Sequence, residues 1–361
     1  MATRPAQPGR RMTVETEIRS TPLEFCPLCG SPGVTIHTNQ RDRIYQAPGV
    51  WGHRQCSGPR CGLIWLDPMP WPEDIGKAYE TYYTHSEAPT ITTSTAKRFQ
   101  QVMAEGYVQS RFGYTHDVGP PWYRWLRPLA FVHPGGEAEL AAWVLYLPAP
   151  RPGARLVEVG CGSGDMLLRM ERLGWEAEGV EVDERAAEAA RAKGLTVHLG
   201  ELQSHRFPDT YADAVVLQHV LEHLHDPLGV LAEASRILRP GGSLIILTPN
   251  ANSLGRRFFG SSWYPLDPPR HLMLYSVTSM RRALEAVPGL EILRLRSTVR
   301  YARSIWGFSR QIQRFGRAER LETSVVSQII GLPYQQAQRL LQLVRNQAGD
   351  ELLLIARKAA A

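Results

Sequence analysis

The chain is 361 residues long, 43% of them hydrophobic, and it carries a formal net charge of +6. This length exceeds one small domain and predicts about two, with enough apolar material to bury a core. The sequence has no run of about 18 apolar residues, and its N-terminus carries arginines without the apolar stretch of a secretory signal. These features argue against a membrane-spanning or secreted protein, and we expect a cytoplasmic one.

The N-terminal part holds four of the five cysteines. Residues 1–20 contain prolines and charges without periodicity, which predicts a disordered arm. Two cysteine pairs follow in CPLCG and CSGPRCG, and the second pair encloses four residues instead of the usual two. Four thiolates in two tight turns suit tetrahedral coordination of one structural Zn2+; the alternative is a group of buried free thiols. We therefore expect a zinc-ribbon-like domain over 21–87, with the metal held by Cys26, Cys29, Cys56 and Cys61.

A mixed helical and aromatic segment comes next. Residues 96–112 have helical spacing, and residues 119–133, GPPWYRWLRPLAFVH, combine prolines with large aromatic side chains. Residues 137–147 predict a further helix. We expect 88–150 to form a linker or a lid, with the aromatic side chains packed between two domains or, as the alternative, placed at a membrane interface.

The stretch 155–165, RLVEVGCGSGD, predicts a buried strand that enters a glycine-rich turn and then a helix over 166–173. Glycines in this turn let the backbone come within contact distance of a ligand. A dinucleotide fingerprint, G-x-G-x-x-G, would need a third glycine where Asp165 stands, so the ligand is not expected to be NAD or FAD. Glu158 precedes the glycines and Glu181 ends the next strand. Such carboxylates suit an ammonium group and the two hydroxyls of a ribose, and they predict a nucleoside that carries an amino acid.

From Arg155 onward, expected strands and helices alternate, which predicts a parallel sheet with helices on both faces. A mainly helical insertion over 301–345 separates the last two strands. The seven strands are expected over residues 155–159, 176–181, 195–199, 214–217, 243–247, 290–296 and 351–357.

Four motifs, EVGCGSGD, GVEVD, DAVVLQHVLEHLHDP and LRPGGSLIILTPN, together resemble the successive motifs of class I S-adenosylmethionine-dependent methyltransferases. The N-terminal CPLCG and CGLIWLDPMP are similar to the opening of many bacterial methyltransferases of this type. The resemblance implies an α/β fold with a seven-stranded Rossmann-like sheet, in which the last strand is antiparallel and inserted beside the sixth. It places the S-adenosylmethionine-binding domain at 151–300 and the final strand within 346–361.

The resemblance also implies the cofactor residues. The first strand and the glycine turn would line the methionine part of S-adenosylmethionine, and Glu181 would bind the ribose. The adenine would lie against residues after the second, third and fourth strands. The full expected set is Glu158, Gly160, Cys161, Gly162, Gly164, Glu181, Val182, Leu202, Gln203 and Gln218.

The acceptor is expected over WYPLDPPRHLMLYS, residues 263–276, where three prolines limit backbone freedom. An imidazole suits proton abstraction near neutral pH, so His271 is the first candidate for a general base and His219 the second. The alternative is that His271 only bonds a loop carbonyl and that proximity suffices for transfer. Expected substrate contacts are Trp263, Tyr264, Arg270 and His223.

We therefore predict methyl transfer to an oxygen of a small or carrier-bound metabolite, such as a natural product, a glycan or a quinol. A non-catalytic binding protein is the alternative. His219 to His223 also match H-x-x-E-H, a metallopeptidase motif, but His219 leaves a strand instead of lying on an established helix. Nucleic acid is not an expected partner, because the cysteine segment lacks base-stacking aromatic residues. The arginine-rich segment 294–320 predicts solvated helix faces, with peripheral membrane contact left open, as is the oligomeric state.

Overall fold

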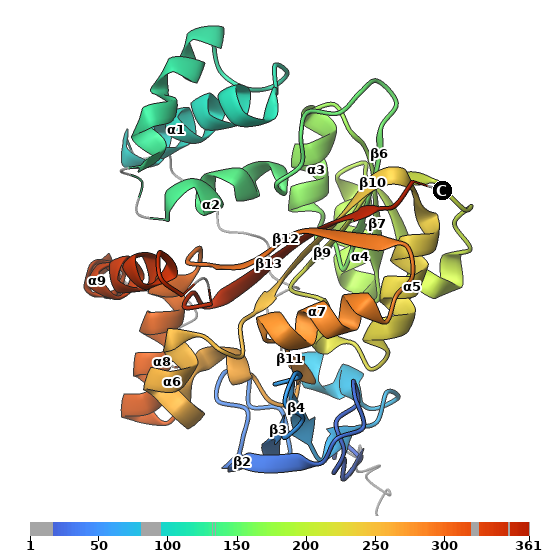
Figure 1. Ribbon diagram of the computed structural model, residues 1–361, viewed down its shortest axis with the longest axis vertical. Coiled ribbons are helices and arrows are strands. Elements are labelled where there is room, and N and C mark those ends of the chain that lie inside the picture. The colour runs from blue at the N-terminus through green and yellow to red at the C-terminus, as the bar shows by residue number, and fades with distance from the viewer. Residues whose placement is uncertain are drawn as a thin grey trace, which may run out of the picture.

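The computed structural model describes residues 17–80, 95–131, 133, 135–318, 325–345 and 347–360. Its centre is a seven-stranded sheet (Figure 1). Most of the predicted N-terminal arm, up to residue 16, lies outside the described residues. The strands of the sheet are β6 (Arg155–Val159), β7 (Glu176–Glu181), β8 (Thr196–Leu199), β9 (Ala212–Gln218), β10 (Leu238–Pro249), β12 (Leu290–Thr298) and β13 (Glu351–Lys358).

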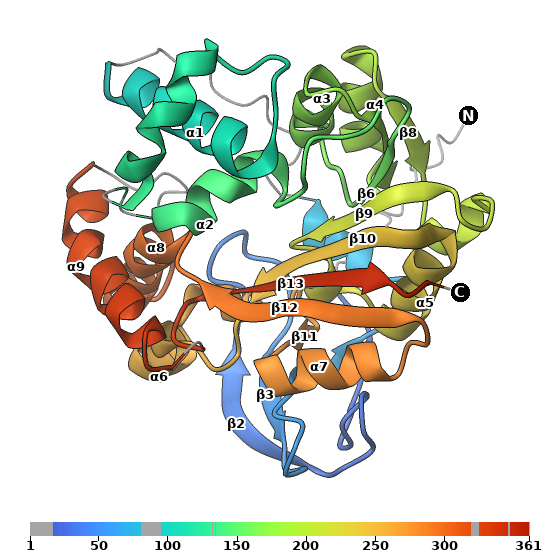
Figure 2. The ribbon, with the colours of Figure 1, turned by 45° about the horizontal axis from the view of Figure 1, so that its top comes forward.

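The strand order is β12-β13-β10-β9-β6-β7-β8. Strands β6 to β10 pair in parallel, whereas β13 runs antiparallel to both β10 and β12. Figure 2 shows β13 between β10 and β12. The predicted α/β fold with seven strands and an inserted, antiparallel last strand is therefore confirmed. Residues 239–242 lie in an irregularity inside β10, where the register to β9 shifts between Leu238 and Ser243.

Helices cover both faces of this sheet, as predicted. Side-chain caps define their starts: the Asp183 carboxylate accepts backbone N–H groups at the start of α4, and Ser276 and Ser279 form a capping box on α7. The helices next to the sheet are α3 (Asp165–Arg172), α4 (Glu184–Ala192), α5 (Pro227–Ile237) and α7 (Val277–Glu285).

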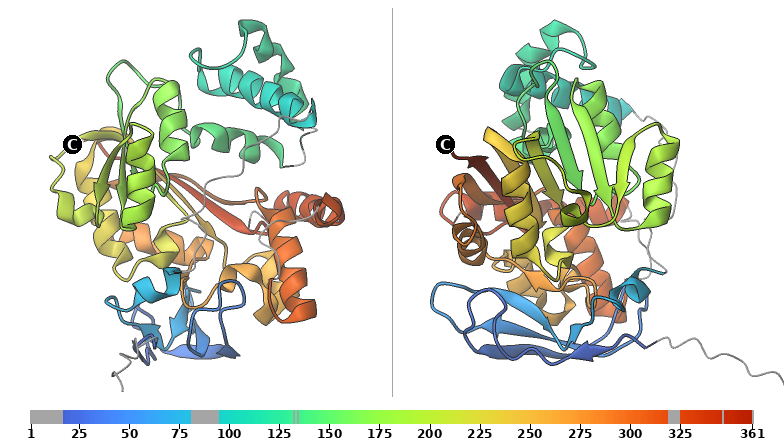
Figure 3. Two further views of the ribbon diagram at one scale, coloured as in Figure 1. Left: turned by 180° about the vertical axis from the view of Figure 1, so that it is seen from behind. Right: turned by 90° about the vertical axis from the view of Figure 1, so that its right-hand side faces the viewer.

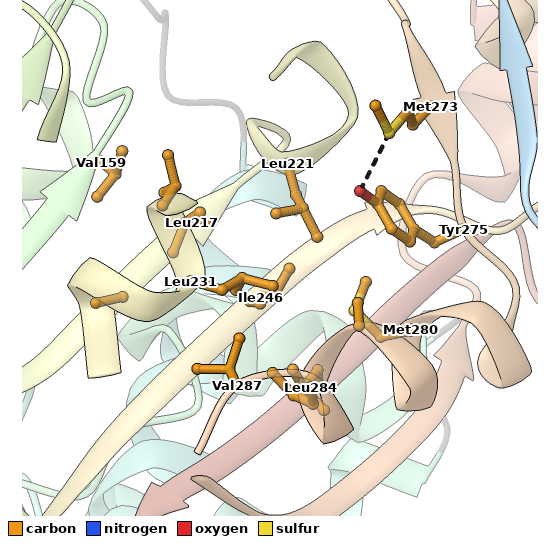
Figure 4. Close-up of a cluster of buried hydrophobic side chains, with 14 of the residues drawn as sticks. Val159, Leu217, Leu221, Leu231, Ile246, Met273, Tyr275, Met280, Leu284 and Val287 are labelled. Atoms are coloured by element: carbon orange, nitrogen blue, oxygen red, sulfur yellow. Dashed lines mark hydrogen bonds between the residues drawn. The ribbon is translucent and has the colours of Figure 1, made fainter. Parts of the chain in front are cut away.

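Each face of the sheet has its own hydrophobic core. Figure 4 shows the cluster in which Leu217 of β9 and Ile246 of β10 pack near Leu231 of α5 and Leu284 of α7. The opposite face packs against α1 (Thr95–Phe112), α2 (Gly136–Ala141), α3 and α4. Because the central strands are buried on both sides, they read as nearly continuous apolar runs.

The late helical insertion lies between β12 and β13, as expected. It comprises α8 (Ala302–Phe315) and α9 (Val325–Gln342), and α6 (Leu254–Phe259) packs against α8. Within the described part of the chain, no helix combines the length and apolar character needed to cross a membrane.

The N-terminal cysteine segment forms a small antiparallel sheet of β2 (Gly33–Gln40), β3 (Trp51–Cys56), β4 (Ile64–Asp67) and β11 (Met273–Leu274). A second pair joins β1 (Ser20–Thr21) to β5 (Met69–Pro70). Strand β11 comes from the chain after β10 and pairs with β4, so a segment that follows the main sheet completes the sheet of the N-terminal module. Figure 3 shows this module, in blue, at one end of the molecule and α1 at the other.

Candidate active site

A cavity of about 1860 Å³ opens where β6, β7, β9 and β10 end. Its walls include the last residue of each strand: Val159, Glu181, Gln218 and Pro249. Open parallel sheets bind ligands at this carboxyl edge. Residues 72–80 of the N-terminal module, among them Tyr79, complete one wall.

The glycine turn after β6 forms the floor of one end of this cavity. Gly160 has a φ of +68°, and a Cβ at this position would lie 2.4 Å from Cγ2 of Val220. Gly162 has a φ of +54° with open space beside it. The Gly162 N–H donates to Oε2 of Glu181 (2.7 Å), and the Asp183 N–H donates to Oε1 (2.9 Å). Glu181 is thereby held in a fixed orientation, with lone pairs left for ligand hydroxyls.

Glu158 lies beneath this turn with 4% of its surface exposed. No described residue forms a hydrogen bond with its Oε2 atom. Burial, together with the nearby charge of Glu181, raises the pKa of Glu158 to about 8. A buried acid without a partner is costly unless a cation approaches it. Since Glu184 and Glu201 also line this end of the cavity, the site favours a positively charged ligand over a dinucleotide.

The other end of the cavity contains two imidazoles with defined tautomers. Nδ1 of His271 lies 2.7 Å from the Pro265 carbonyl oxygen, and Nδ1 of His223 lies 3.0 Å from the Arg270 carbonyl oxygen. A carbonyl only accepts, so each Nδ1 is the donor. The Nε2 of His271 lies 4.0 Å from Oδ2 of Asp267. Burial and the neighbouring His271 lower the pKa of His223 to about 4. Both histidines line the cavity, with ring centroids 4.7 Å apart.

His219 has the opposite electrostatic setting. Its Nε2 lies 3.0 Å from Oε1 of Glu351, and its Nδ1 lies 3.4 Å from Oε1 of Glu222. Burial alone would lower its pKa, but these carboxylates outweigh burial and raise it to about 9. The ring is therefore an imidazolium at neutral pH, which makes it a poor proton acceptor. Its φ of +55° shows that the backbone is also constrained there.

Two of the residues expected to contact the substrate, Arg270 and Trp263, do not line the cavity. Arg270 is fully buried and pairs with Asp42 of the N-terminal module (2.8 Å) and with Asp267 (2.5 Å), so its charge is already neutralised. Trp263 is 1% exposed and its indole N–H donates to Asp350 (3.3 Å). Neither side chain is among the described cavity-lining residues, whereas the expected Tyr264 is.

The four N-terminal cysteines converge on one point. Their Sγ atoms all lie within 4.8 Å of one another, with 3.7 Å between Cys26 and Cys61 and 3.4 Å between Cys29 and Cys56. A tetrahedral zinc with bonds of about 2.3 Å places its sulfurs roughly 3.8 Å apart. The Gly58 N–H lies 3.3 Å from the Cys56 sulfur, as the backbone does around metal-bound thiolates. This donor set could hold one zinc ion.

Residues 133–295 match a family model described as a methyltransferase domain. This segment also contains the glycine turn, Glu158 and Glu181, and strands β6 to β10. This part of the chain is thus similar to a methyltransferase domain.

The relatives of this methyltransferase domain include ubiquinone biosynthesis O-methyltransferases. That of Xanthomonas campestris pv. campestris (strain B100) is 33% identical over 165 residues, which are 44% of this chain and 64% of that protein. That of Methylococcus capsulatus (strain ATCC 33009 / NCIMB 11132 / Bath) is 32% identical over 105 residues, 27% of this chain and 44% of that protein. The chain thus spans 44% to 64% of the length of these two curated relatives.

Solved structures resemble the methyltransferase domain at lower identity. An S-adenosylmethionine-dependent methyltransferase from Mesorhizobium loti aligns with a TM-score of 0.42 and 19% identity, over 63% of this chain and all of that chain. Phosphoethanolamine N-methyltransferase 2 of Haemonchus contortus aligns with a TM-score of 0.44 and 15% identity, over 82% of this chain and 64% of that one.

Most cofactor residues expected from the sequence line the cavity of the methyltransferase domain. Glu158, Cys161 and Gly164 lie behind its lining. Gly164 packs against Leu195 and Ala190, where a Cβ would clash at 2.4 Å and 2.9 Å. The expected residues in the cavity wall are Gly160, Gly162, Glu181, Val182, Leu202, Gln203 and Gln218.

Sequence reasoning missed several residues around the acceptor end. Tyr79 of the N-terminal module lies 2.9 Å from Nδ1 of His223 through its hydroxyl, and Tyr301 and Glu351 line the wall beside His219. Glu222 is fully buried beneath the histidines. Only Glu222 had a sequence signal, because it belongs to the H-x-x-E-H motif. Tyr79 and Glu351 reach the site through contacts between distant parts of the chain.

Proposed function

We propose that this chain is an S-adenosylmethionine-dependent O-methyltransferase whose acceptor is a hydroxyl of a small or carrier-bound, quinol-like metabolite. The observation that carries the proposal is the buried pair Glu158 and Glu181 at the glycine turn, which suits a cofactor with an ammonium group and a ribose. The names of the O-methyltransferase relatives support oxygen as the methylated atom. The cavity exceeds the roughly 300–1,000 Å³ of single-ligand pockets, so cofactor and acceptor fit together.

When bound, S-adenosylmethionine supplies a methyl group already activated by its sulfonium. The protein must hold the acceptor in line, exclude water and remove one proton. Glu158 would take the ammonium group and Glu181 the ribose hydroxyls. His271, whose Nδ1 donates to the Pro265 carbonyl at the other end of the cavity, would accept the proton of the acceptor hydroxyl at Nε2. His219, already protonated, would instead hold Glu222 and Glu351 in place.

We further propose that Cys26, Cys29, Cys56 and Cys61 hold one zinc ion. Four protein ligands leave no position for water, so the metal would be structural. It would brace the N-terminal module that supplies Tyr79 and Asp42 to the methyltransferase domain.

The direct test uses purified full-length protein. Calorimetry should detect S-adenosylmethionine binding, and tritiated S-adenosylmethionine should label a hydroxylated acceptor from a panel of catechols and quinols with short apolar tails. His271→Ala should lower turnover by roughly 10² to 10⁴ and leave cofactor affinity within a factor of a few. Equal affinity for NAD, or no binding of S-adenosylmethionine, would refute the proposal. Binding without transfer to any acceptor would favour the non-catalytic alternative, whereas the structure offers no support for a peptidase because His219 is ion-paired.

A further inference from the structure

Three metal-binding side chains meet at the acceptor end of the cavity, separate from the four cysteines. Glu222 and His223 lie in the 3₁₀ helix Leu221–His223 that follows β9, and His271 lies in the loop before β11. One ligand atom from each of the three lies within 4.8 Å of the other two. They come from two chain segments that the fold brings together.

The surroundings of the two imidazoles orient them as metal ligands. In each ring a backbone carbonyl accepts the Nδ1 hydrogen, at Pro265 for His271 and at Arg270 for His223. The Tyr79 hydroxyl oxygen lies 2.9 Å from the same Nδ1 of His223. Metal-bound histidines in proteins almost always donate their second nitrogen in this way, which sets the tautomer and aims the other nitrogen at the metal.

The carboxylate is also held from behind. Oε2 of Glu222 accepts a hydrogen bond from the Thr248 hydroxyl (2.9 Å). No described residue forms a hydrogen bond of good geometry with its Oε1, which lies 3.4 Å from the His219 ring. Glu222 is fully buried. The neighbouring His219 imidazolium offsets part of the cost of burying its charge, but Oε1 still lacks a well-formed hydrogen bond.

We propose that Glu222, His223 and His271 form a site for one divalent transition metal at the acceptor end of the cavity. Two imidazoles and one carboxylate suit Zn2+, Fe2+, Co2+ or Mn2+, whereas Mg2+ and Ca2+ prefer oxygen ligands. Bonds of about 2.1 Å require small rotations to bring the three ligand atoms closer. Three protein ligands leave positions open for an oxygen from the cavity, unlike the closed cysteine site.

The consequence for catalysis rests on the proposed function. A metal at this position would bind the acceptor hydroxyl oxygen and lower its pKa, so that its proton leaves to water. The oxygen electron pair then forms the bond to the methyl carbon while the carbon–sulfur bond breaks. The electrons of that bond stay on sulfur, which becomes a neutral thioether. His271 would thus act as a metal ligand and not as a free base.

The test is a titration with Co2+ of full-length protein that holds one zinc per chain, the amount that the four cysteines would bind. Thiolate complexes of Co2+ absorb strongly in the near ultraviolet and nitrogen–oxygen complexes do not, so the spectrum separates the two sites. We expect one Co2+ per chain without thiolate absorption. His271→Ala and Glu222→Gln should weaken this binding by about 100-fold or more, since even second-layer changes cost 10- to 100-fold. His116→Ala, which alters an exposed histidine in the loop after α1, is the matched control and should bind as wild type does.

Co2+ uptake only with thiolate absorption, or equal uptake by wild type and His271→Ala, would overturn the metal site. Circular dichroism checks that each variant is folded. If Glu222→Gln does not fold, His271→Ala alone still decides the test. Calorimetry with S-adenosylmethionine on the same samples separates the two proposals. If the protein binds S-adenosylmethionine but not Co2+ at this site, only the metal-site proposal is refuted and His271 stays the candidate general base. If it binds Co2+ at this site but not S-adenosylmethionine, the proposed function is refuted and the metal site stands.

Discussion

Replacing Glu158 by glutamine should stabilise the cofactor-free protein while it weakens cofactor binding. The carboxyl group is 4% exposed, and burial with the charge of Glu181 raises its pKa from 4.5 to about 8. Between these values the folded protein keeps a proton that the unfolded chain has lost. The free energy of unfolding therefore falls as pH rises from about 4.5 to about 8, because the folded state binds more protons.

The magnitude follows from that interval. Each pH unit above 4.5 lowers the free energy of unfolding by about 1.36 kcal/mol, which gives about 3 kcal/mol at pH 7. Glutamine has nearly the size of the protonated acid and does not ionise. Glu158→Gln should therefore match wild type near pH 4.5 and exceed it by about 2 to 3 kcal/mol at pH 7. S-adenosylmethionine should offset most of this advantage, because the hydrogen bond that it forms with the charged Glu158 contributes about 1.5 to 3 kcal/mol.

Urea denaturation of both proteins at several pH values between 4.5 and 8 measures this difference, and calorimetry measures the cofactor affinity. Glu176→Gln is the matched control, since Glu176 begins the neighbouring strand, its side chain is 59% exposed and it pairs with Arg155. That control should show no pH-dependent gain. A Glu158→Gln protein that is less stable than wild type at pH 7, or a difference that does not change with pH, would refute the argument that Glu158 is a buried acid without a partner.

The other predictions concern the cofactor, the module contact and the cysteines. Glu181→Ala should weaken S-adenosylmethionine binding by about 1 to 3 kcal/mol in calorimetry, and it should also loosen the turn whose Gly162 amide it accepts; unchanged affinity would contradict the assigned role. Asp42→Ala should lower the free energy of unfolding by about 3 to 5 kcal/mol in urea, because it removes one of the two carboxylates that neutralise the fully buried Arg270. The exposed ion pair between Arg155 and Glu176 is the control, and Arg155→Ala should lower the free energy of unfolding by at most about 1 kcal/mol. Elemental analysis should find about one tightly held zinc per chain, and a folded Cys26→Ser that keeps the same zinc content would count against the cysteine site.

Much of the fold could be predicted because it depends on local patterns. The apolar runs of β6, β9 and β10 identify strands covered on both faces, and the glycines mark a turn whose positive φ values exclude most side chains. All seven expected strands of the sheet are present, six within one or two residues of the expected bounds, whereas β10 begins five residues earlier than expected and ends two later. The acidic residues at the ends of β6 and β7 were identifiable for the same reason, since the position of a residue at a strand end is a local property.

Only the tertiary structure decided how the acceptor end is arranged. His219 and His271 are both histidines close to strands, and their sequence positions do not show which groups surround each ring. Glu222 and Glu351, the latter 132 residues away in the chain, together raise the pKa of His219 to about 9, while the Pro265 carbonyl orients His271. From the sequence alone, Arg270 was a reasonable candidate for binding a substrate anion. In the structure Asp42, 228 residues away in the chain, neutralises its charge. Charge and hydrogen bonding depend on which groups share a buried space, and contacts between distant segments determine that.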